Sequence, residues 1–241
     1  MEVLNNIISW LESTPLLGAI VNFIAVILGA AIGLLLKKGI SERIGDTVMK
    51  GLSLCVLLIG VQGMIKGEKT LVIILSVVLG GLIGELLRID DGMKWLGDAV
   101  EKKFRKEGST VSVAEGFVTA SLLFIVGAMA VVGSLESGLK LDHNTAYAKS
   151  MLDFVSAMIF ASSLGVGVIL SAFAVLVYQG GITLFAGLLA PVLSDAVITE
   201  MSAAGSVIIV GLALNLLGIT KIKVANYIPA IFLPILFCTF M

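Results

Sequence analysis

Charged residues are scarce in this sequence. Asp, Glu, Lys and Arg together make up 14% of it, whereas hydrophobic residues make up 58%. A soluble domain carries about a quarter charged residues. Strand-type alternation of polar and apolar residues is also lacking, which argues against a membrane β-barrel. The mean hydropathy is +1.10, and apolar stretches of roughly 18 residues or more follow one another. The sequence therefore predicts an all-α, polytopic membrane protein, with residues 1–241 forming one integral domain in the lipid bilayer.

Residues for several kinds of chemistry are missing. The sequence contains one histidine and two cysteines. It has no GxxxxGK[ST] pattern of a P-loop ATPase and no HExxH pattern of a zinc protease. The regular arginine series of a voltage sensor is absent as well. Cys55 and Cys238 lie in apolar segments, so no disulfide framework is indicated. The net charge of −1 indicates no nucleic-acid partner. We expect no enzymatic activity, no cofactor and no metal.

Eight apolar segments predict about eight transmembrane spans. They are residues 18–36, 48–65, 70–88, 114–135, 145–163, 167–190, 202–219 and 222–241. The region 145–190 allows two interpretations. It is either one long broken segment or two short spans joined at SLGVGV, where Gly165 and Gly167 permit a sharp turn.

The distribution of basic residues favours the two-span interpretation. With eight spans and both termini outside, the inner loops hold twelve basic residues and the outer loops hold three. This asymmetry is the one that the positive-inside rule expects. The outer three are Lys66, Lys69 and Lys140, and the single histidine, His143, also falls in an outer loop. The sequence thus predicts that the N-terminus and the C-terminus both lie outside.

Two segments outside the spans are predicted to lie on the membrane surface. Residues 1–15 resemble a short amphipathic helix that ends near Pro15. The longest loop, residues 89–113, is predicted to be cytoplasmic, and its apolar side chains share one helical face. These side chains are Trp95, Leu96, Val100 and Phe104. We expect this loop to lie on the inner leaflet.

An internal repeat is suggested by two alignments. Residues 18–36 align with 167–185 without a gap, and 56–67 align with 207–218 after a two-residue insertion. Spans 1–3 would then correspond to spans 6–8, and the two units would be inverted in the membrane. Residues 114–133 also align with 148–167, which places Glu115 opposite Lys149 and Thr119 opposite Asp153. Inverted repeats are common in secondary transporters, although some channels share them.

Two charged residues fall inside a predicted span of about 19 residues. A lysine or an aspartate at a helix centre costs about 2.5–3.5 kcal/mol on insertion scales. Lys149 and Asp153 are four residues apart, so they share a helix face and can pair. Two interpretations remain open. The pair is either a structural contact that docks the span in the bundle, or a substrate or proton site on an aqueous path.

Further polar residues in the spans are candidates for the same path: Asn22, Glu115, Thr119, Ser156, Gln179 and Asn215. Interhelical hydrogen bonding is the simpler role for any single Asn or Gln. Gln179 precedes Gly180 and Gly181, which could break the helix and free carbonyl groups for a ligand. Glu115 also suits the first turn of a helix.

Glycine is abundant, with 27 residues. The stretches GAAIG (29–33) and GGLIG (80–84) are GxxxG motifs, which permit close helix contact. This contact can form within the protomer or in a homodimer.

Four stretches of the sequence are similar to a known family. They are EGFVTASLLFIVGAMAVVGSLESGL (115–139), AKSMLDFVSAMIFASSLGVGVILSA (148–172), YQGGIT (178–183) and GLALNLLGITKIKVANYIPA (211–230). With VNFIAVILGAAIGLLLKK and VLGGLIGELLRID, nearly the whole chain resembles the bacterial inner-membrane proteins grouped as domain of unknown function 554. The resemblance implies membrane transport and a location in the bacterial inner membrane. It implies no substrate and no site residues.

Three functions are compatible with the sequence. The first is a secondary transporter or ion-coupled permease for a small solute, in which substrate or a proton breaks the Lys149–Asp153 pair. The second is a passive channel or a dimeric pore. The third is a structural or signalling membrane protein that acts through the 88–113 loop.

Overall fold

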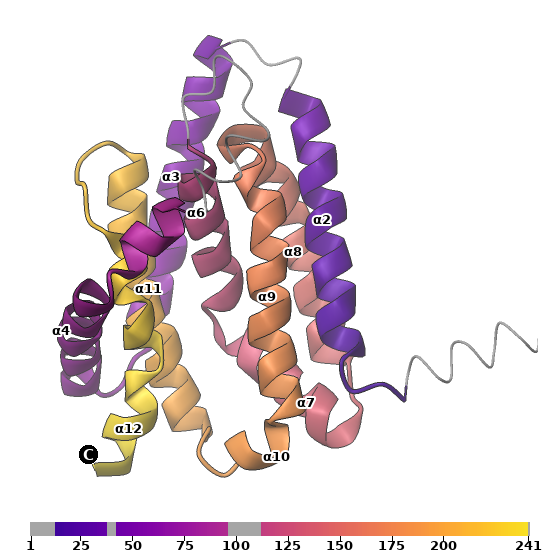
Figure 1. Cartoon of the computed structure of the whole chain (residues 1–241), viewed down its shortest axis with the longest axis vertical. Helices are drawn as coiled ribbons and strands as arrows, with labels where there is room; N and C mark the ends of the chain where they lie inside the picture. Colours follow the sequence, from indigo (N-terminus) through magenta and orange to yellow (C-terminus); the bar gives the residue numbers. More distant parts are fainter. Residues whose placement is uncertain (1–12, 38–41, 96–111, 241) are drawn as a thin grey trace, which may run out of the picture.

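The computed structural model describes residues 13–37, 42–95 and 112–240. These residues form an elongated bundle of helices (Figure 1). The helices are α2 (Leu17–Lys37), α3 (Glu42–Met64), α4 (Thr70–Leu87), α6 (Val113–Ile125), α7 (Ala128–Lys140), α8 (Asn144–Leu164), α9 (Gly167–Leu184), α10 (Ala186–Leu189), α11 (Asp195–Leu216), the 3₁₀ helix η1 (Val224–Ile231) and α12 (Leu233–Phe240). We call the ends of the bundle the upper and lower end, as they appear in Figure 1.

Five of the described helices are long and apolar enough to cross a membrane, namely α2, α3, α4, α9 and α11. A sixth span results if α6 and α7, which are bent by 63°, are taken together. Large apolar side chains are exposed on the outside of the bundle, for example Leu82 at 57% and Val177 at 75%. Such exposure fits contact with lipid rather than water. The prediction of a polytopic helical membrane protein is confirmed.

The chain runs along the bundle in alternating directions. α2 starts at the lower end, and α3 returns from the upper end (Figure 1). α8 runs parallel to α2, because Gly18 lies against Ala146 and Gly33 lies against Met158. α8 has 21 residues, enough for about 31 Å of helix. It falls short of the hydropathy of a candidate span because it carries Lys149 and Asp153.

Two predicted spans are not single helices. The segment 114–135 breaks at Val126 and Gly127, where Gly127 has a φ of 137° that L side chains rarely adopt. The segment 222–241 begins as the 3₁₀ helix η1 and continues as α12. Pro229 in η1 and Pro234 in α12 each lack a backbone donor, which explains why one regular α-helix does not form.

The region 145–190 contains two long helices, α8 and α9, followed by the short helix α10. α8 ends at Leu164, and α9 begins at Gly167. Between them, Gly165 has a φ of 81°, a conformation that favours glycine. This sharp break between two helices fits the interpretation as two spans.

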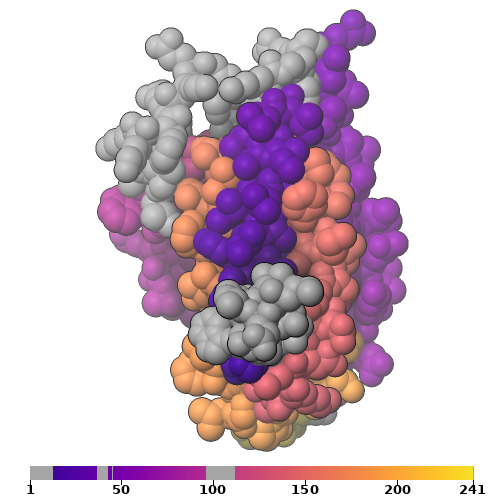
Figure 2. Space-filling view, turned by 90° about the vertical axis from the view of Figure 1, so that its right-hand side faces the viewer, coloured from indigo at the N-terminus to yellow at the C-terminus, as the bar shows by residue number. Residues whose placement is uncertain are grey.

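Both GxxxG motifs are used within the protomer. Gly29 and Gly33 of α2 lie against the backbone carbonyls of Phe154 and Met158 in α8. In the second motif, Gly80 and Gly84 of α4 contact the backbone of η1. Figure 2 shows α2 seated between α8 and α9. These glycine faces are covered by the same chain, so they do not offer a free surface for a homodimer.

Three helix pairs cross at positions separated by the same distance in sequence. Phe23 of α2 and Phe173 of α9 stack edge to face, with ring centroids 5.1 Å apart. Gly60 of α3 lies against Val210 of α11, and Gly80 of α4 lies against Ala230 of η1. In each pair the two residues are 150 positions apart. The α2–α9, α3–α11 and α4–η1 pairs are all antiparallel.

Two sequence predictions fall largely outside the described residues. Of the segment 1–15, only residues 13–15 are described, and they form a turn. Of the 89–113 loop, residues 89–95 are described and are helical, and Trp95 has an exposed fraction of 73%. Leu96, Val100 and Phe104 lie outside the described part of the chain.

Candidate functional site

Four of the predicted site residues meet in one buried cluster, which we call the lower cluster. Lys149 Nζ donates to Asp153 Oδ1 over 2.5 Å. Asn22 Nδ2 donates to Asp153 Oδ2 over 2.9 Å and to Gln179 Oε1 over 3.1 Å. The exposed fractions are 7% for Lys149, 3% for Asp153, 1% for Asn22 and 5% for Gln179. The cluster therefore joins three helices, α8, α2 and α9, out of contact with solvent.

Close helix packing positions this cluster. On α2, Gly18, Asn22, Gly29 and Gly33 lie at intervals of four, seven and four residues, so they form one stripe along the helix. Gly18, Gly29 and Gly33 let α2 approach the backbone of α8. Asn22 lies within this stripe, so its amide reaches the carboxylate of Asp153.

Lys149 has spare bonding capacity inside the bundle. Its ammonium group has three donors, and within the described residues its hydrogen bond goes to Asp153. The ammonium also lies 5.8 Å from the centroid of the Phe124 ring, within cation–π range. Asn22 Oδ1 is buried and has no hydrogen-bond partner among the described residues. The cluster is thus only partly satisfied, which is costly for buried polar groups.

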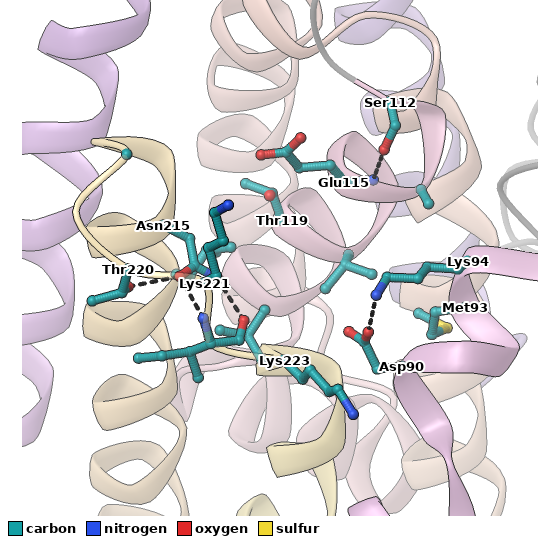
Figure 3. Close-up of a pocket in the computed structure, with 16 residues that line it drawn as sticks. Asp90, Met93, Lys94, Ser112, Glu115, Thr119, Asn215, Thr220, Lys221 and Lys223 are labelled. Carbon is teal, nitrogen blue, oxygen red and sulfur yellow. Dashed lines mark hydrogen bonds and ion pairs between the residues drawn. The ribbon is translucent and has the colours of Figure 1, made fainter.

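Glu115, Thr119 and Asn215 are not part of the lower cluster. They line a cavity of about 410 Å³ near the upper end, which we call the upper cavity (Figure 3). Its polar lining also includes Asp90, Lys94, Ser112, Thr220, Lys221 and Lys223, and its apolar wall is formed mainly by Met93, Val118, Leu212, Ile222 and Val224. Ser156 is half-buried on α8 and lines neither site.

Asn215 is occupied by the loop that follows its own helix. Its Nδ2 donates to the carbonyl of Ile222 over 2.6 Å, and its Oδ1 accepts from the backbone of Ile222 and the hydroxyl of Thr220. These bonds close the turn after α11 and leave Asn215 little capacity for a ligand.

Two lysines beside the upper cavity are paired. Lys94 Nζ lies 2.7 Å from Asp90 Oδ2. Lys223 Nζ donates to Glu85 Oε1 over 2.8 Å, and this hydrogen bond raises the pKa of Lys223. For Lys221 the described residues provide no ion-pair partner.

Sequence reasoning missed two notable side chains. The predicted spans 167–190 and 202–219 leave Glu200 in the outer loop between them, but it is 2% exposed within α11. Its Oε1 accepts from the backbone N–H groups of Glu68 and Lys69, each over 2.8 Å, just before α4 begins. The only available signal was an acid inside the apolar stretch VITEMSAAGS. Lys221 was counted only as a loop charge, and nothing local in the sequence places it at a cavity.

His143 is also buried, with an exposed fraction of 6%, at the start of α8, and its Nδ1 lies 3.1 Å from Ser137 Oγ. Within the described ranges, no three His, Cys, Asp or Glu side chains gather in a way that could hold a metal ion.

Two relatives cover nearly the full length of this chain. It is 29% identical over 221 residues to the "Uncharacterized membrane protein YdfK" of Bacillus subtilis (strain 168), and the match covers 90% of this chain and 93% of the relative. It is 30% identical over 220 residues to the "Uncharacterized protein YqgA" of Escherichia coli (strain K12), with 90% and 94% covered. No solved structure matches.

The family comparison agrees with these relatives and with the helical architecture. The family model described as "Protein of unknown function (DUF554)" matches residues 17–239, which include both the lower cluster and the upper cavity. This chain therefore belongs to the DUF554 family of membrane proteins.

Proposed function

We propose that this protein is a secondary transporter or ion-coupled permease for a small solute. The observation that carries this proposal is the lower cluster, in which a Lys–Asp ion pair is buried where three helices meet. Charged residues inside a membrane bundle are expensive, and they characteristically mark ion and substrate paths. A pair that served only to dock α8 would be replaceable by apolar residues at little cost.

The cluster is suited to exchange partners during transport. Asp153 holds both Lys149 and Asn22, so protonation of its carboxylate would weaken both contacts together. Lys149 would then have a free ammonium for an anionic group of the solute. Since Asn22 Nδ2 also donates to Gln179, a shift of the Asn22 amide away from Asp153 would be transmitted to the contact between α2 and α9. A proton or solute at Asp153 would thus favour one conformation over another.

We further propose eight crossings and an inverted repeat of spans 1–3 and 6–8. The alternating course of the chain supports eight crossings, with α6–α7 as one broken span and η1–α12 as the last. The three antiparallel contacts at a constant separation of 150 residues support the inverted relation, because a two-fold axis in the membrane plane would pass through each of them. The basic upper end would face the cytoplasm, and both termini would lie outside.

The burial of the cluster favours a transporter over a passive channel. In an open channel, polar path residues would be in contact with water. Here the four residues of the lower cluster are at most 7% exposed, whereas the upper cavity lies at one end of the bundle. This arrangement is typical of a carrier with one side closed.

The test is transport by the purified protein in liposomes. Currents would be recorded during proton, sodium and mixed-solute jumps, with Asp153→Asn beside the wild type. We expect a wild-type current that Asp153→Asn abolishes. Current at the wild-type level in that variant would contradict the role of Asp153. Very high flux without saturation would favour a channel. No flux under any of these conditions, from folded protein, would contradict both electrogenic alternatives.

A further inference from the structure

The upper cavity contains two opposite charges that do not neutralise each other. Of its charged lining residues, Lys94 pairs with Asp90, and Lys223 pairs with Glu85. Glu115 and Lys221 remain. In the part of the chain that the structure describes, neither forms an ion pair, and they lie beyond ion-pair distance of each other. A carboxylate and an ammonium therefore face one cavity with space between them.

A buried hydroxyl group adds a third recognition element. Thr119 lines the cavity and has an exposed fraction of 0%. Its Oγ1 has no hydrogen-bond partner among the described residues, not even the carbonyl of Glu115 one turn earlier. Buried hydroxyl groups are normally satisfied. In the view of Figure 3, Thr119 lies between the side chains of Glu115 and Lys221. A ligand in the cavity would supply the missing partner.

The remaining wall is apolar. Val118 and Leu212 contribute branched side chains, and Met93 contributes a flexible one. A volume of about 410 Å³ is within the usual range of pockets for small ligands, roughly 300–1,000 Å³. Among the described residues, the site thus combines one carboxylate and one ammonium that form no ion pair, and one buried hydroxyl without a partner, with an apolar surface.

From this arrangement we infer that the upper cavity binds a small zwitterion, with its ammonium group on Glu115 and its acidic group on Lys221. The apolar wall would hold a short hydrocarbon side chain, so an α-amino acid fits the site. The headgroup of phosphatidylethanolamine offers the same pair of charges. As an account of the solute, this inference rests on the proposed transport function, but the binding itself does not.

Binding is tested by thermal unfolding of the whole chain in nanodiscs made only of phosphatidylglycerol, which has no zwitterionic headgroup. The probe is an equimolar mixture of the twenty common amino acids, followed by each one singly. A ligand that binds the native state raises the melting temperature. We expect a rise with at least one amino acid, and no rise with its N-acetyl or amide derivative, each of which lacks one charge.

Two variants assign the two charges. Glu115→Gln should weaken binding of the amino acid by roughly 10- to 100-fold, the loss expected for one charged hydrogen bond, and should abolish discrimination against the N-acetyl derivative. Lys221→Met should weaken binding of the amino acid to a similar degree, and it should abolish discrimination against the amide derivative. The matched controls are Glu68→Gln and Lys66→Met, which remove similar charges at the lower end and should leave binding unchanged.

The outcomes separate this inference from the transport proposal. The lipid is tested by native mass spectrometry of the protein purified from membranes that contain phosphatidylethanolamine. No rise in melting temperature with any amino acid, together with no bound phosphatidylethanolamine, would overturn the inference. Binding that needs only one of the two charges would overturn it as well. Bound phosphatidylethanolamine without amino-acid binding would support the zwitterion site and assign it to lipid. Amino-acid binding without any flux would keep the site and refute transport.

Discussion

Removing both charges of the lower cluster separates a structural ion pair from a working one. In the double variant Lys149→Met with Asp153→Asn, no charge remains in the lower cluster. The asparagine introduced for Asp153 keeps an oxygen that accepts from Asn22 Nδ2, the bond now made over 2.9 Å. The methionine introduced for Lys149 keeps an apolar side chain of similar length near Phe124. Replacement of a buried ion pair by residues of similar volume is often neutral or stabilising by about 1–4 kcal/mol.

The single variant behaves differently. Asp153→Asn leaves the Lys149 ammonium, whose side chain is 9% exposed, without a counter-ion. Breaking a buried pair in this way costs about 3–5 kcal/mol. In a chain of this length that corresponds to a fall in melting temperature of about 10 °C. We therefore expect the single variant to unfold earlier and the double variant to melt at or above the wild-type temperature.

The decisive measurement is transport by the double variant in liposomes, after its melting temperature has been shown to match the wild type. We expect no proton- or solute-driven current. Lys66→Met with Glu68→Gln, which changes the same kinds of charge at an exposed turn, should transport normally. Full transport by the folded double variant would refute the reasoning, because the pair would then serve only to dock α8.

Three other predictions concern packing, capping and orientation. Gly84→Val should lower the melting temperature, because the valine side chain would overlap the backbone of η1 and overpacking costs about 1–3 kcal/mol. Gly92→Val, where the added side chain meets open space, should lower it less. Equal effects of the two variants would contradict the close packing of α4 against η1. Glu200→Leu should destabilise the lower end by about 1–3 kcal/mol for each of the two N–H groups it leaves unpaired, as measured by thermal unfolding. In a variant without the native cysteines, a membrane-impermeant maleimide added to intact cells should label Lys140→Cys and not Lys221→Cys, and the reverse pattern would invert the proposed topology.

Local patterns in the sequence predicted the ion pair, but not its surroundings. The spacing of Lys149 and Asp153 places both on one helix face, whatever the tertiary fold. Whether Asn22 and Gln179 reach the pair depends on how α2 and α9 pack against α8, and helix periodicity carries no such information. The stripe of Gly18, Gly29 and Gly33 marked the close face of α2, but its partner helix became known only from the structure.

The separation of Glu115 and Thr119 from the cluster was implicit in the sequence alignment. If residues 114–133 and 148–167 are inverted equivalents, then Glu115 corresponds to Lys149 at the opposite end of the bundle. The expectation of one common path for all these polar residues conflicts with that alignment. The break at Gly127 was harder to predict, because the sequence contains 27 glycines and, of those that the structure describes, Gly127, Gly165 and Gly218 adopt a positive φ. Pro229 and Pro234 argue against one regular α-helix in the last predicted span. The length of the apolar run 222–241 alone favoured such a helix.

The packing also indicates which contacts would change during transport. α2 and α8 form a parallel pair with backbone contacts at Gly29 and Gly33. α6 and α9 form a second parallel pair, in which Gly116 and Gly167 lie against the backbone of the other segment. Backbone contacts of this kind leave little room for sliding, so each pair is expected to move as a unit.

Between the two pairs, α2 and α9 meet through side chains, including the aromatic contact of Phe23 with Phe173 and the Asn22–Gln179 hydrogen bond. Opening of the lower end should therefore separate α2 from α9. Leu16, just before α2, lies beside Gly180 of α9. In a variant that lacks the native cysteines and carries Leu16→Cys and Gly180→Cys, a short bifunctional thiol reagent should therefore cross-link the two positions, which we call the staple. The staple should abolish flux, and cleaving it should restore flux, while amino-acid binding in the upper cavity persists. Undiminished flux through the stapled protein would show that α2 and α9 do not separate, and the cluster would then have to open between α2 and α8 instead.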